Sequence, residues 1–201
     1  MSNEVLMEAE LCPEADRSPR RWFAVQVKQR SEKTAAYIAT NRGFETFLPL
    51  HTVRRRWSDR IKTVELPLFP GYVFCRLNSA HRLPLLTVPG VYGLVGVGKT
   101  PRPIEDREIE NIQTVVNSGL WSEPCAFLES GQLVRLEEGP LAGLEGIYVE
   151  SRSEHRIVVS VSLLKRSVAI EIERDWVRPL KDSGLVVPVR GASLHLARIS
   201  G

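Results

Sequence analysis

The side chains with the clearest chemical use are the basic and aromatic residues between positions 54 and 62. Five are positively charged and one is a tryptophan, namely Arg54, Arg55, Arg56, Trp57, Arg60 and Lys62. A polar pair at positions 58 and 59 predicts a hairpin that turns there, with its strands inside residues 52–65. Such side chains bind nucleic-acid phosphates, and an indole can stack on an unpaired base. The alternative is a solvated hairpin whose arginines simply face water.

Positive charge is concentrated around this hairpin. The whole chain has a net charge of +3. Residues 21–104 alone carry 14 lysines and arginines against four acids, a net of +10, whereas residues 1–20 and 105–201 carry −3 and −4. A basic block of this size favours a polyanionic partner, with nucleic acid as the leading candidate.

The cysteines and histidines do not form a metal site or a nucleophilic site in the sequence. Cys12, Cys75 and Cys125 are far apart, and the four histidines are equally scattered. Zinc sites and disulfide frameworks need closer, paired spacing, and no Gly-rich phosphate loop or pair of carboxylates stands out. We therefore expect no metal, no cofactor and no enzyme. We expect Cys75, which lies in an apolar run, to be a small core residue.

Residues 64–76 contain the strongest candidate for binding a protein partner. Two prolines frame Phe69, and a glycine then leads into the apolar run 72–74. Because proline cannot donate to a β-ladder, each of these prolines belongs at the edge or the start of a strand. The arrangement holds aromatic side chains at a rigid bend. The candidate docking residues are Phe69, Pro70, Tyr72 and Phe74. Tyr72 and Phe74 share one face of a strand, so part of this set can instead belong to the core.

The elements that position these residues follow a mixed pattern. Strands are predicted at 22–27, 44–50 and 91–95, and an irregular or helical stretch at 78–88. Helices are predicted at 31–42, with Gly43 at its end, and at 105–117, where acids crowd the first turn. This order is typical of a small α+β sandwich.

Beyond residue 130 the pattern becomes purely β. Strands are predicted at 133–136, 146–149, 156–161 and 167–172, where apolar residues alternate in the last strand. Gly139, Gly143 and Gly146 permit tight turns between the first two strands. Such a segment forms a small barrel. Residues 1–20, 120–129 and 181–201 have no clear period, and we expect a disordered arm, a linker and a loosely ordered tail.

Several of these segments resemble the NusG family of transcription factors. Residues 21–28 with Glu32, 68–74, 89–91 and 96–104 with the following acidic helix resemble the NusG N-terminal (NGN) domain. Residues 131–149 resemble a KOW motif, the SH3-like barrel of NusG and some ribosomal proteins. The resemblance covers about residues 21–180. It implies an NGN α/β sandwich with an antiparallel sheet at 21–119, a linker at 120–129 and a KOW β-barrel at 130–180.

The resemblance also implies partners. The factor would bind the clamp helices of RNA polymerase through Phe69, Pro70, Tyr72 and Phe74 and suppress pausing and termination. The loop 78–85 would touch the opposite side of the cleft. The residues expected to contact non-template DNA or nascent nucleic acid are Lys28, Arg30, Arg54, Arg55, Arg56, Trp57, Arg60 and Lys62. The KOW domain would recruit a small-subunit ribosomal protein or Rho through Leu163 and Leu164.

The subgroup and some alternatives stay open. Residues 56–60 with 64–72, and residues 163–172 ahead of 175–179, look closest to specialised paralogues of the RfaH, UpxY and LoaP kind, which act on selected long operons. A general housekeeping factor, or a KOW-containing ribosomal or RNA-binding protein, is the alternative. Some relatives refold the KOW domain as a helical hairpin; the alternation at 168–172 favours the barrel without excluding a second state. No apolar run approaches the roughly 18 residues of a membrane span and no signal peptide is evident, so we expect a cytoplasmic monomer without membrane contact.

Overall fold

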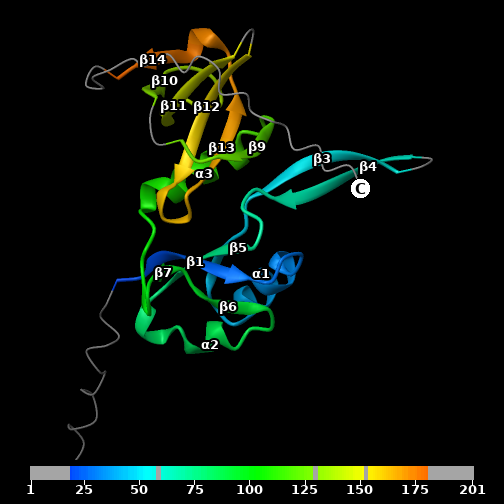
Figure 1. Cartoon of the computed structure of the whole chain (residues 1–201), viewed down its shortest axis with the longest axis vertical. Coiled ribbons are helices and arrows are strands. Elements are labelled where there is room, and N and C mark those ends of the chain that lie inside the picture. Colours follow the sequence, from blue (N-terminus) through cyan, green and yellow to red (C-terminus); the bar gives the residue numbers. More distant parts are fainter. Residues whose placement is uncertain (1–18, 58–59, 129–130, 152–153, 181–201) are drawn as a thin grey trace, which may run out of the picture. The chain divides into compact units, whose positions relative to one another are not determined.

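The computed structural model describes residues 19–57, 60–128, 131–151 and 154–180 (Figure 1). The described residues up to 49 and from 69 to 109 form one compact unit, and those from 50 to 68 and from 110 onward form the other. These are called the first and the second unit below. Most of the predicted N-terminal arm and the whole predicted C-terminal tail lie outside the described residues. None of the described helices is long and apolar enough to cross a membrane.

The first unit is built on a four-stranded antiparallel sheet. Its strands, in their order across the sheet, are β2 (Glu45–Phe47), β5 (Tyr72–Leu77), β1 (Arg21–Val27) and β6 (Val91–Leu94). β5 is therefore a central strand, and its register with β1 runs from Leu77 opposite Arg21 to Tyr72 opposite Gln26. The strand predicted to follow the proline-framed bend is confirmed.

The other elements of the first unit connect these strands. They are α1 (Glu32–Asn41), the 3-10 turn η2 (Ser79–His81), α2 (Leu83–Leu86), β7 (Gly96–Val97) and β8 (Thr100–Pro101). Both the helix after Ser31 and the helical stretch at 78–88 are confirmed. The Ser31 side chain makes no capping hydrogen bond, so it marks the start of α1 without satisfying one of its free N–H groups.

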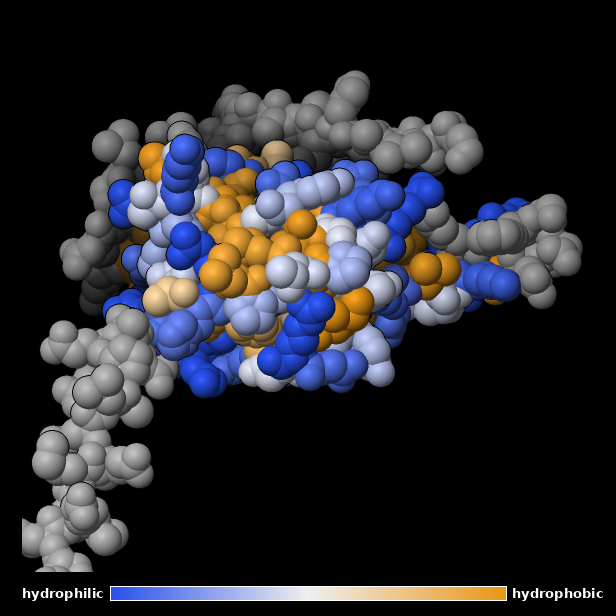
Figure 2. Space-filling view, turned by 90° about the horizontal axis from the view of Figure 1, so that it is seen from below, coloured by the Kyte–Doolittle hydropathy of each residue, from blue (hydrophilic) through white to orange (hydrophobic). Residues whose placement is uncertain are grey.

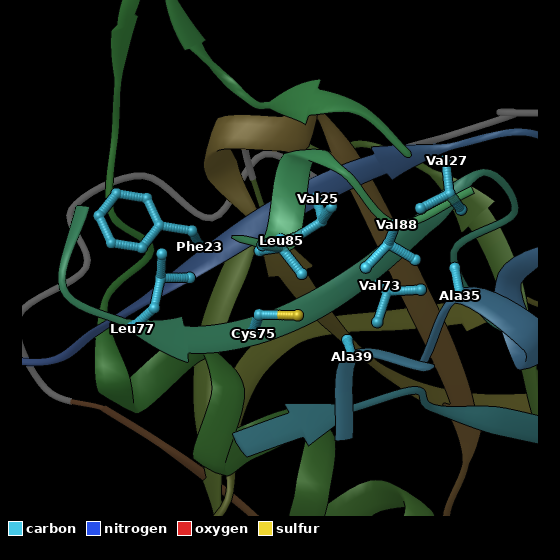
Figure 3. Packing of buried hydrophobic residues seen from close by; sticks show 10 residues of the cluster. All are labelled: Phe23, Val25, Val27, Ala35, Ala39, Val73, Cys75, Leu77, Leu85 and Val88. Carbon is cyan, nitrogen blue, oxygen red and sulfur yellow. The ribbon is translucent and has the colours of Figure 1, made fainter. Parts of the chain in front are cut away.

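One face of the sheet carries the core of the first unit. Alternate residues of β1 and β5 meet small residues of α1 and two residues around α2 (Figure 3). The members are Phe23, Val25, Val27, Val73, Cys75, Leu77, Ala35, Ala39, Leu85 and Val88. Cys75 is thus a core residue, as predicted, and burial raises the pKa of its thiol to about 12. A thiol in this state is not an activated nucleophile.

The second unit contains a hairpin and a larger sheet. The hairpin consists of β3 (Leu50–Trp57) and β4 (Arg60–Pro67). The sheet is antiparallel throughout and its order is β14 (Val177–Pro179), β10 (Gln132–Leu136), β11 (Glu145–Ser151), β12 (Glu154–Val161), β13 (Arg166–Glu171) and β9 (Ser122–Ala126). Two 3-10 turns, η3 (Ser162–Leu164) and η4 (Arg174–Trp176), flank β13. The helix α3 (Asp106–Asn117) spans the boundary between the units.

The expected α+β class with antiparallel sheets is confirmed, and so are the four strands predicted beyond residue 130. Two local predictions are wrong. The single strand expected at 44–50 is divided into β2 and the start of β3, because Pro49 lacks the N–H that a continuous ladder needs. The linker expected at 120–129 contains β9, which pairs with β13 over five residues. The division into units also differs from the predicted boundary near residue 119, since the hairpin groups with the second unit.

Candidate functional site

The bend between β4 and β5 is packed from within by its own aromatic residue. The Phe69 side chain is only 1% exposed, and its ring meets that of Phe74 edge to face, with 5.4 Å between ring centroids. Phe74 in turn stacks on Phe47 of the neighbouring strand at 6.2 Å. Both side chains are therefore buried in this conformation. Their predicted contact with a partner stays a prediction.

Pro70 and Tyr72 differ from these two phenylalanines. Both are only half-buried, so each keeps surface that a partner can cover. Tyr72 is the first residue of β5 and lies opposite Gln26 of β1. Although Tyr72 and Phe74 share one face of the strand, Tyr72 lies at its end, where less of the protein covers it. Of the four predicted docking residues, these two keep the geometry that docking requires.

A buried carboxylate holds the bend in place. Glu32, the first residue of α1, is 4% exposed, and its Oε1 accepts a hydrogen bond from the Gly71 N–H at 2.8 Å. The Gly71 carbonyl accepts from the Val27 N–H at 2.9 Å. Gly71 has a φ of 84°, a conformation that residues with a Cβ rarely adopt. The bend is thus fixed to α1 on one side and to β1 on the other. No sequence signal marks Glu32 beyond its place in the family resemblance.

The basic hairpin is present where the sequence predicts it. β3 and β4 pair from Leu50 opposite Pro67 to Trp57 opposite Arg60, and Figure 1 shows them as a long two-stranded ribbon. Residues 58 and 59, where the turn is predicted, lie outside the described residues. Arg54, Arg56 and Lys62 are exposed. For Arg55, Trp57 and Arg60 the structure describes the backbone alone. The register nevertheless concentrates the basic positions in the outer half of the hairpin, as contact with a polyanion requires.

Lys28 and Arg30, the two other predicted nucleic-acid ligands, lie in the connection between β1 and α1. Both are exposed. The Lys28 N–H donates to the Gly90 carbonyl at 2.7 Å, and Arg30 adopts a left-handed φ of 66° that is uncommon for a residue with a side chain. They belong to the first unit, whereas the hairpin belongs to the second. A common basic surface therefore stays a prediction.

The segment 78–85 borders the apolar surface of the first unit. In the space-filling view, hydrophobic residues emerge among hydrophilic ones on the face that carries α2 and β6 (Figure 2). The exposed apolar side chains of the first unit include Leu83, which is 69% exposed, with Tyr92 and Val97. Asn78 closes the start of η2, where its Oδ1 accepts from the Ala80 N–H at 3.0 Å. The predicted contact of this loop with the cleft stays a prediction.

The predicted partner loop of the second unit lies between β12 and β13. Leu163 and Leu164 form η3 and are half-buried. Lys165 ends the turn in the left-handed conformation, with a φ of 49°, and its Nζ lies 4.5 Å from the centroid of the Phe127 ring. The loop is thus apolar and accessible, and its neighbour in space is the residue that follows β9.

Close packing explains two of the three predicted turn glycines. A Cβ on Gly139 would lie 2.8 Å from the Trp176 ring, and one on Gly146 would lie 2.7 Å from the Val158 carbonyl oxygen. Gly143 has a left-handed φ of 89° but open space around it. Gly139 and Gly146 therefore permit close packing against Trp176 and β12.

Sequence reasoning missed a polar cluster on β9. Arg156 donates to Glu123 of β9 at 2.7 Å and to Glu154 at 2.9 Å, and its guanidinium lies 5.8 Å from the centroid of the Trp121 ring. The His51 Nδ1 of the hairpin lies 3.1 Å from the Ser122 carbonyl oxygen. Burial lowers the pKa of His51, so the neutral ring is favoured and its Nδ1–H donates here. The segment around Glu123 lacks apolar alternation, so no pattern could have identified it.

Comparison with known proteins gives consistent matches. A sequence model described as "Transcription termination factor nusG" matches residues 20–113. The transcription termination/antitermination protein NusG of Escherichia coli strain K12 is 31% identical over 168 residues, which cover 77% of this chain and 93% of that protein. That of Helicobacter pylori strain 26695 is 28% identical over 169 residues, covering 75% and 93%.

One solved structure supports the fold. The structure of Thermotoga maritima NusG, from work on domain interaction in that protein, aligns with a TM-score of 0.52 and 21% identity. The alignment covers 83% of this chain and 99% of that one. At this level of identity the likeness concerns the fold alone.

Proposed function

Because the chain belongs to the NusG family, we propose that it is a transcription elongation and antitermination factor that binds RNA polymerase. The observation that carries the proposal is the match to the Escherichia coli protein. This match covers 93% of that protein, and it covers more residues of this chain than either unit contains, so it includes parts of both units. The relatives are named for transcription termination and antitermination. The factor acts as a cytoplasmic monomer that suppresses pausing and termination.

The proposed polymerase contact is the bend between β4 and β5. Pro70 and Tyr72 supply the exposed surface, and the buried pair Phe69 and Phe74 supports it from within. By family resemblance, the surface that they meet is the pair of clamp helices. Covering the exposed half of one aromatic side chain contributes roughly 1–2 kcal/mol. Replacing Tyr72 with alanine should therefore weaken binding by about tenfold.

Binding to purified RNA polymerase elongation complexes tests this function directly. We expect the wild-type chain to bind and to shorten pauses in single-round transcription, and Tyr72→Ala to lose about tenfold in affinity. Tyr37→Ala is the matched control, because Tyr37 is a 69% exposed tyrosine on α1, away from the bend in sequence. A folded wild-type chain that does not bind elongation complexes would overturn the proposed function.

The proposed nucleic-acid contact is the outer half of the hairpin. Each phosphate contact adds about 0.7–0.9 to the slope of log K against log salt concentration. Replacing Arg54 and Arg56, both exposed, with glutamine should therefore reduce the magnitude of that slope by about 1.4–1.8. The control replaces Lys99 and Arg102, two exposed bases of the first unit, and should leave the slope unchanged. Equal slopes for the wild type and the hairpin variant would refute this assignment.

The proposed second partner binds the second unit through Leu163 and Leu164. By family resemblance it is a small-subunit ribosomal protein or Rho. A specialised factor would recruit it on selected long operons, whereas a general factor would do so on most transcripts. Mapping the occupancy of the chain on transcribed genes across the genome distinguishes the two, because only the specialised factor would be confined to a few operons.

A further inference from the structure

The edge of the second-unit sheet is closed by a strand from the connecting segment. β9 pairs with β13 from Ser122 opposite Ile170 to Ala126 opposite Arg166, and in the described part of the chain it is the last strand of the sheet. An uncovered edge strand offers unpaired N–H and C=O groups to any extended peptide. β9 therefore occupies a position that another strand could take.

The composition of β9 makes it easy to displace. It is only five residues long, and Pro124, opposite Val168, has no N–H to donate to the ladder. Pro124 and Ala126 are exposed, and Ser122 is the single buried residue of the strand. β13, in contrast, buries four of its six residues. Releasing β9 exposes little apolar surface, whereas releasing β13 would open the core.

Besides the bond from the His51 Nδ1 to the Ser122 carbonyl oxygen, two side-chain contacts secure β9 at opposite ends. At one end Glu123 forms the ion pair with Arg156, at 2.7 Å. At the other end the Phe127 ring lies under the ammonium group of Lys165. In β9, an acid and an aromatic residue four positions apart therefore meet Arg156 and Lys165, in a segment that runs antiparallel to β13. Because Lys165 directly follows Leu163 and Leu164, the aromatic position adjoins the proposed partner loop.

We propose that β9 is a displaceable strap, and that the second unit binds its protein partner by exchanging β9 for an extended strand with an acid facing Arg156 and an aromatic residue facing Lys165. The inference rests on the proposed function only in assigning Leu163 and Leu164 to the same partner. The strap keeps the sheet edge covered until that partner arrives. Its exchange leaves the ladder of β13 paired.

The native cysteine on β9 reports whether the strap opens. Burial raises the pKa of Cys125 to about 11, so its thiol reacts slowly with alkylating reagents near pH 8 while β9 is in place. Cys75 in the core of the first unit serves as the internal reference for global unfolding. In a full-length Cys12→Ser background, we expect Cys125 to be alkylated at least about tenfold faster than Cys75.

A charge reversal on the strap provides the first variant. Glu123→Lys replaces the ion pair with a repulsion. It should raise the alkylation rate of Cys125 by about tenfold beyond the effect of the new charge on the Cys125 pKa, which a pH profile of the rate separates, with the rate of Cys75 unchanged. Glu138→Lys makes the same charge change at an exposed position of the second unit and should alter neither rate. If Cys125 reacts only as fast as Cys75 in every variant, β9 opens only on global unfolding and the proposal is overturned.

A reversible lock provides the second variant. Ser167 lies directly opposite Cys125, and paired residues of antiparallel strands have Cα atoms about 4.5–5.5 Å apart, within the range that a disulfide spans. Ser167→Cys therefore allows β9 to be locked by oxidation and released by reduction. Ser167→Ala is the control, because it removes the same hydroxyl, which pairs with Ser160 at 2.6 Å, without providing a second thiol.

The binding probe is a labelled synthetic peptide of residues 120–128 with serine in place of Cys125. We expect it to bind reduced Ser167→Cys at least about tenfold more tightly than the oxidised form, and to bind Glu123→Lys more tightly than the wild type. A peptide with lysine in place of Glu123 and alanine in place of Phe127 should bind about tenfold more weakly. Equal binding of the peptide to the locked and released forms would overturn the proposal that β9 is displaced. Neither readout involves RNA polymerase, so a chain that failed to bind polymerase would refute the proposed function and leave this test intact.

Discussion

The burial of Phe69 gives the sharpest test of the packing at the bend. Its ring is 1% exposed and packs edge to face against Phe74. Truncation to alanine leaves a cavity, and the rigid Pro-Gly bend cannot easily move in to fill it. We therefore expect Phe69→Ala to lower the free energy of unfolding of the first unit, and to affect polymerase binding mainly through that loss of structure.

The magnitude follows from the packing of the ring. Replacing a fully buried phenylalanine by alanine typically costs about 3–5 kcal/mol. An edge-to-face aromatic pair contributes about 0.5–1.5 kcal/mol of this beyond the area buried. We expect a loss of about 3–4 kcal/mol for Phe69→Ala. Phe69→Leu keeps most of the volume and should cost about 1–2 kcal/mol, mainly through loss of the aromatic contact.

The assay must report on the first unit, because Phe69 belongs to it. The alkylation rate of the buried Cys75 does so, since its thiol belongs to the core of that unit. A loss of 3 kcal/mol should raise this rate by about a hundredfold, given that opening is fast relative to alkylation. Tyr37→Ala, at a 69% exposed site, should change it less than about threefold.

One result would refute this reasoning. If Phe69→Ala alkylated Cys75 at the wild-type rate while its affinity for elongation complexes fell, Phe69 would contribute to the interface and not to the core. The bend would then have a second arrangement in which the ring faces outward. The same two measurements on Phe69→Leu separate the effect of filling the cavity from the effect of the aromatic contact. Leucine fills most of the cavity but cannot reproduce the edge-to-face contact.

Three further predictions concern the supports of the two units. Glu32→Ala should destabilise the first unit by about 1–3 kcal/mol in urea unfolding, because the Gly71 N–H loses its buried acceptor, whereas Glu32→Gln should cost less. Gly139→Ala should destabilise the second unit by about 2–4 kcal/mol by thermal melting, and Gly143→Ala by about 1 kcal/mol, because only the first Cβ meets a ring. His51 has a lowered pKa in the folded state, so the unfolded state binds its proton more readily. The contribution of His51 to the free energy of unfolding is therefore complete above about pH 6.5 and decreases as the pH falls below that value. His51→Gln should reduce this pH dependence in urea titrations at pH 7.5 and 5.5.

The sequence predicted the elements whose patterns are local. The alternation at 168–172 identified β13, and the basic segment around its polar turn identified the hairpin and its strands. β9 was missed because Ser122 to Ala126 has neither alternation nor strong β-propensity. Its pairing is imposed by the edge of β13, a tertiary contact that single-sequence patterns do not contain.

The sequence could not predict the burial of Phe69 and Phe74, for a related reason. Alternation shows that Val73 and Phe74 point to opposite faces of β5, but not which face is covered. In the structure both residues are buried. A strand with two buried faces produces a continuous apolar run, which cannot be told from one with an exposed docking face. The accessible Tyr72 could be identified only from its position at the end of the strand.

The registers of two ladders explain why the proline-framed bend exists. Phe47 pairs with Phe74 in one ladder, and Leu50 pairs with Pro67 in the other. Three positions separate Phe47 from Leu50, whereas seven separate Pro67 from Phe74, so the returning strand carries four additional residues. These are residues 68–71, Leu-Phe-Pro-Gly. Without these four residues, the two ladders would form one long hairpin. The four-residue excursion divides it into the β2–β5 pair of the sheet and the basic β3–β4 hairpin. Phe69 and the bond from Gly71 to Glu32 hold that excursion in place, so the features that fix the bend also separate the proposed protein contact from the proposed nucleic-acid contact.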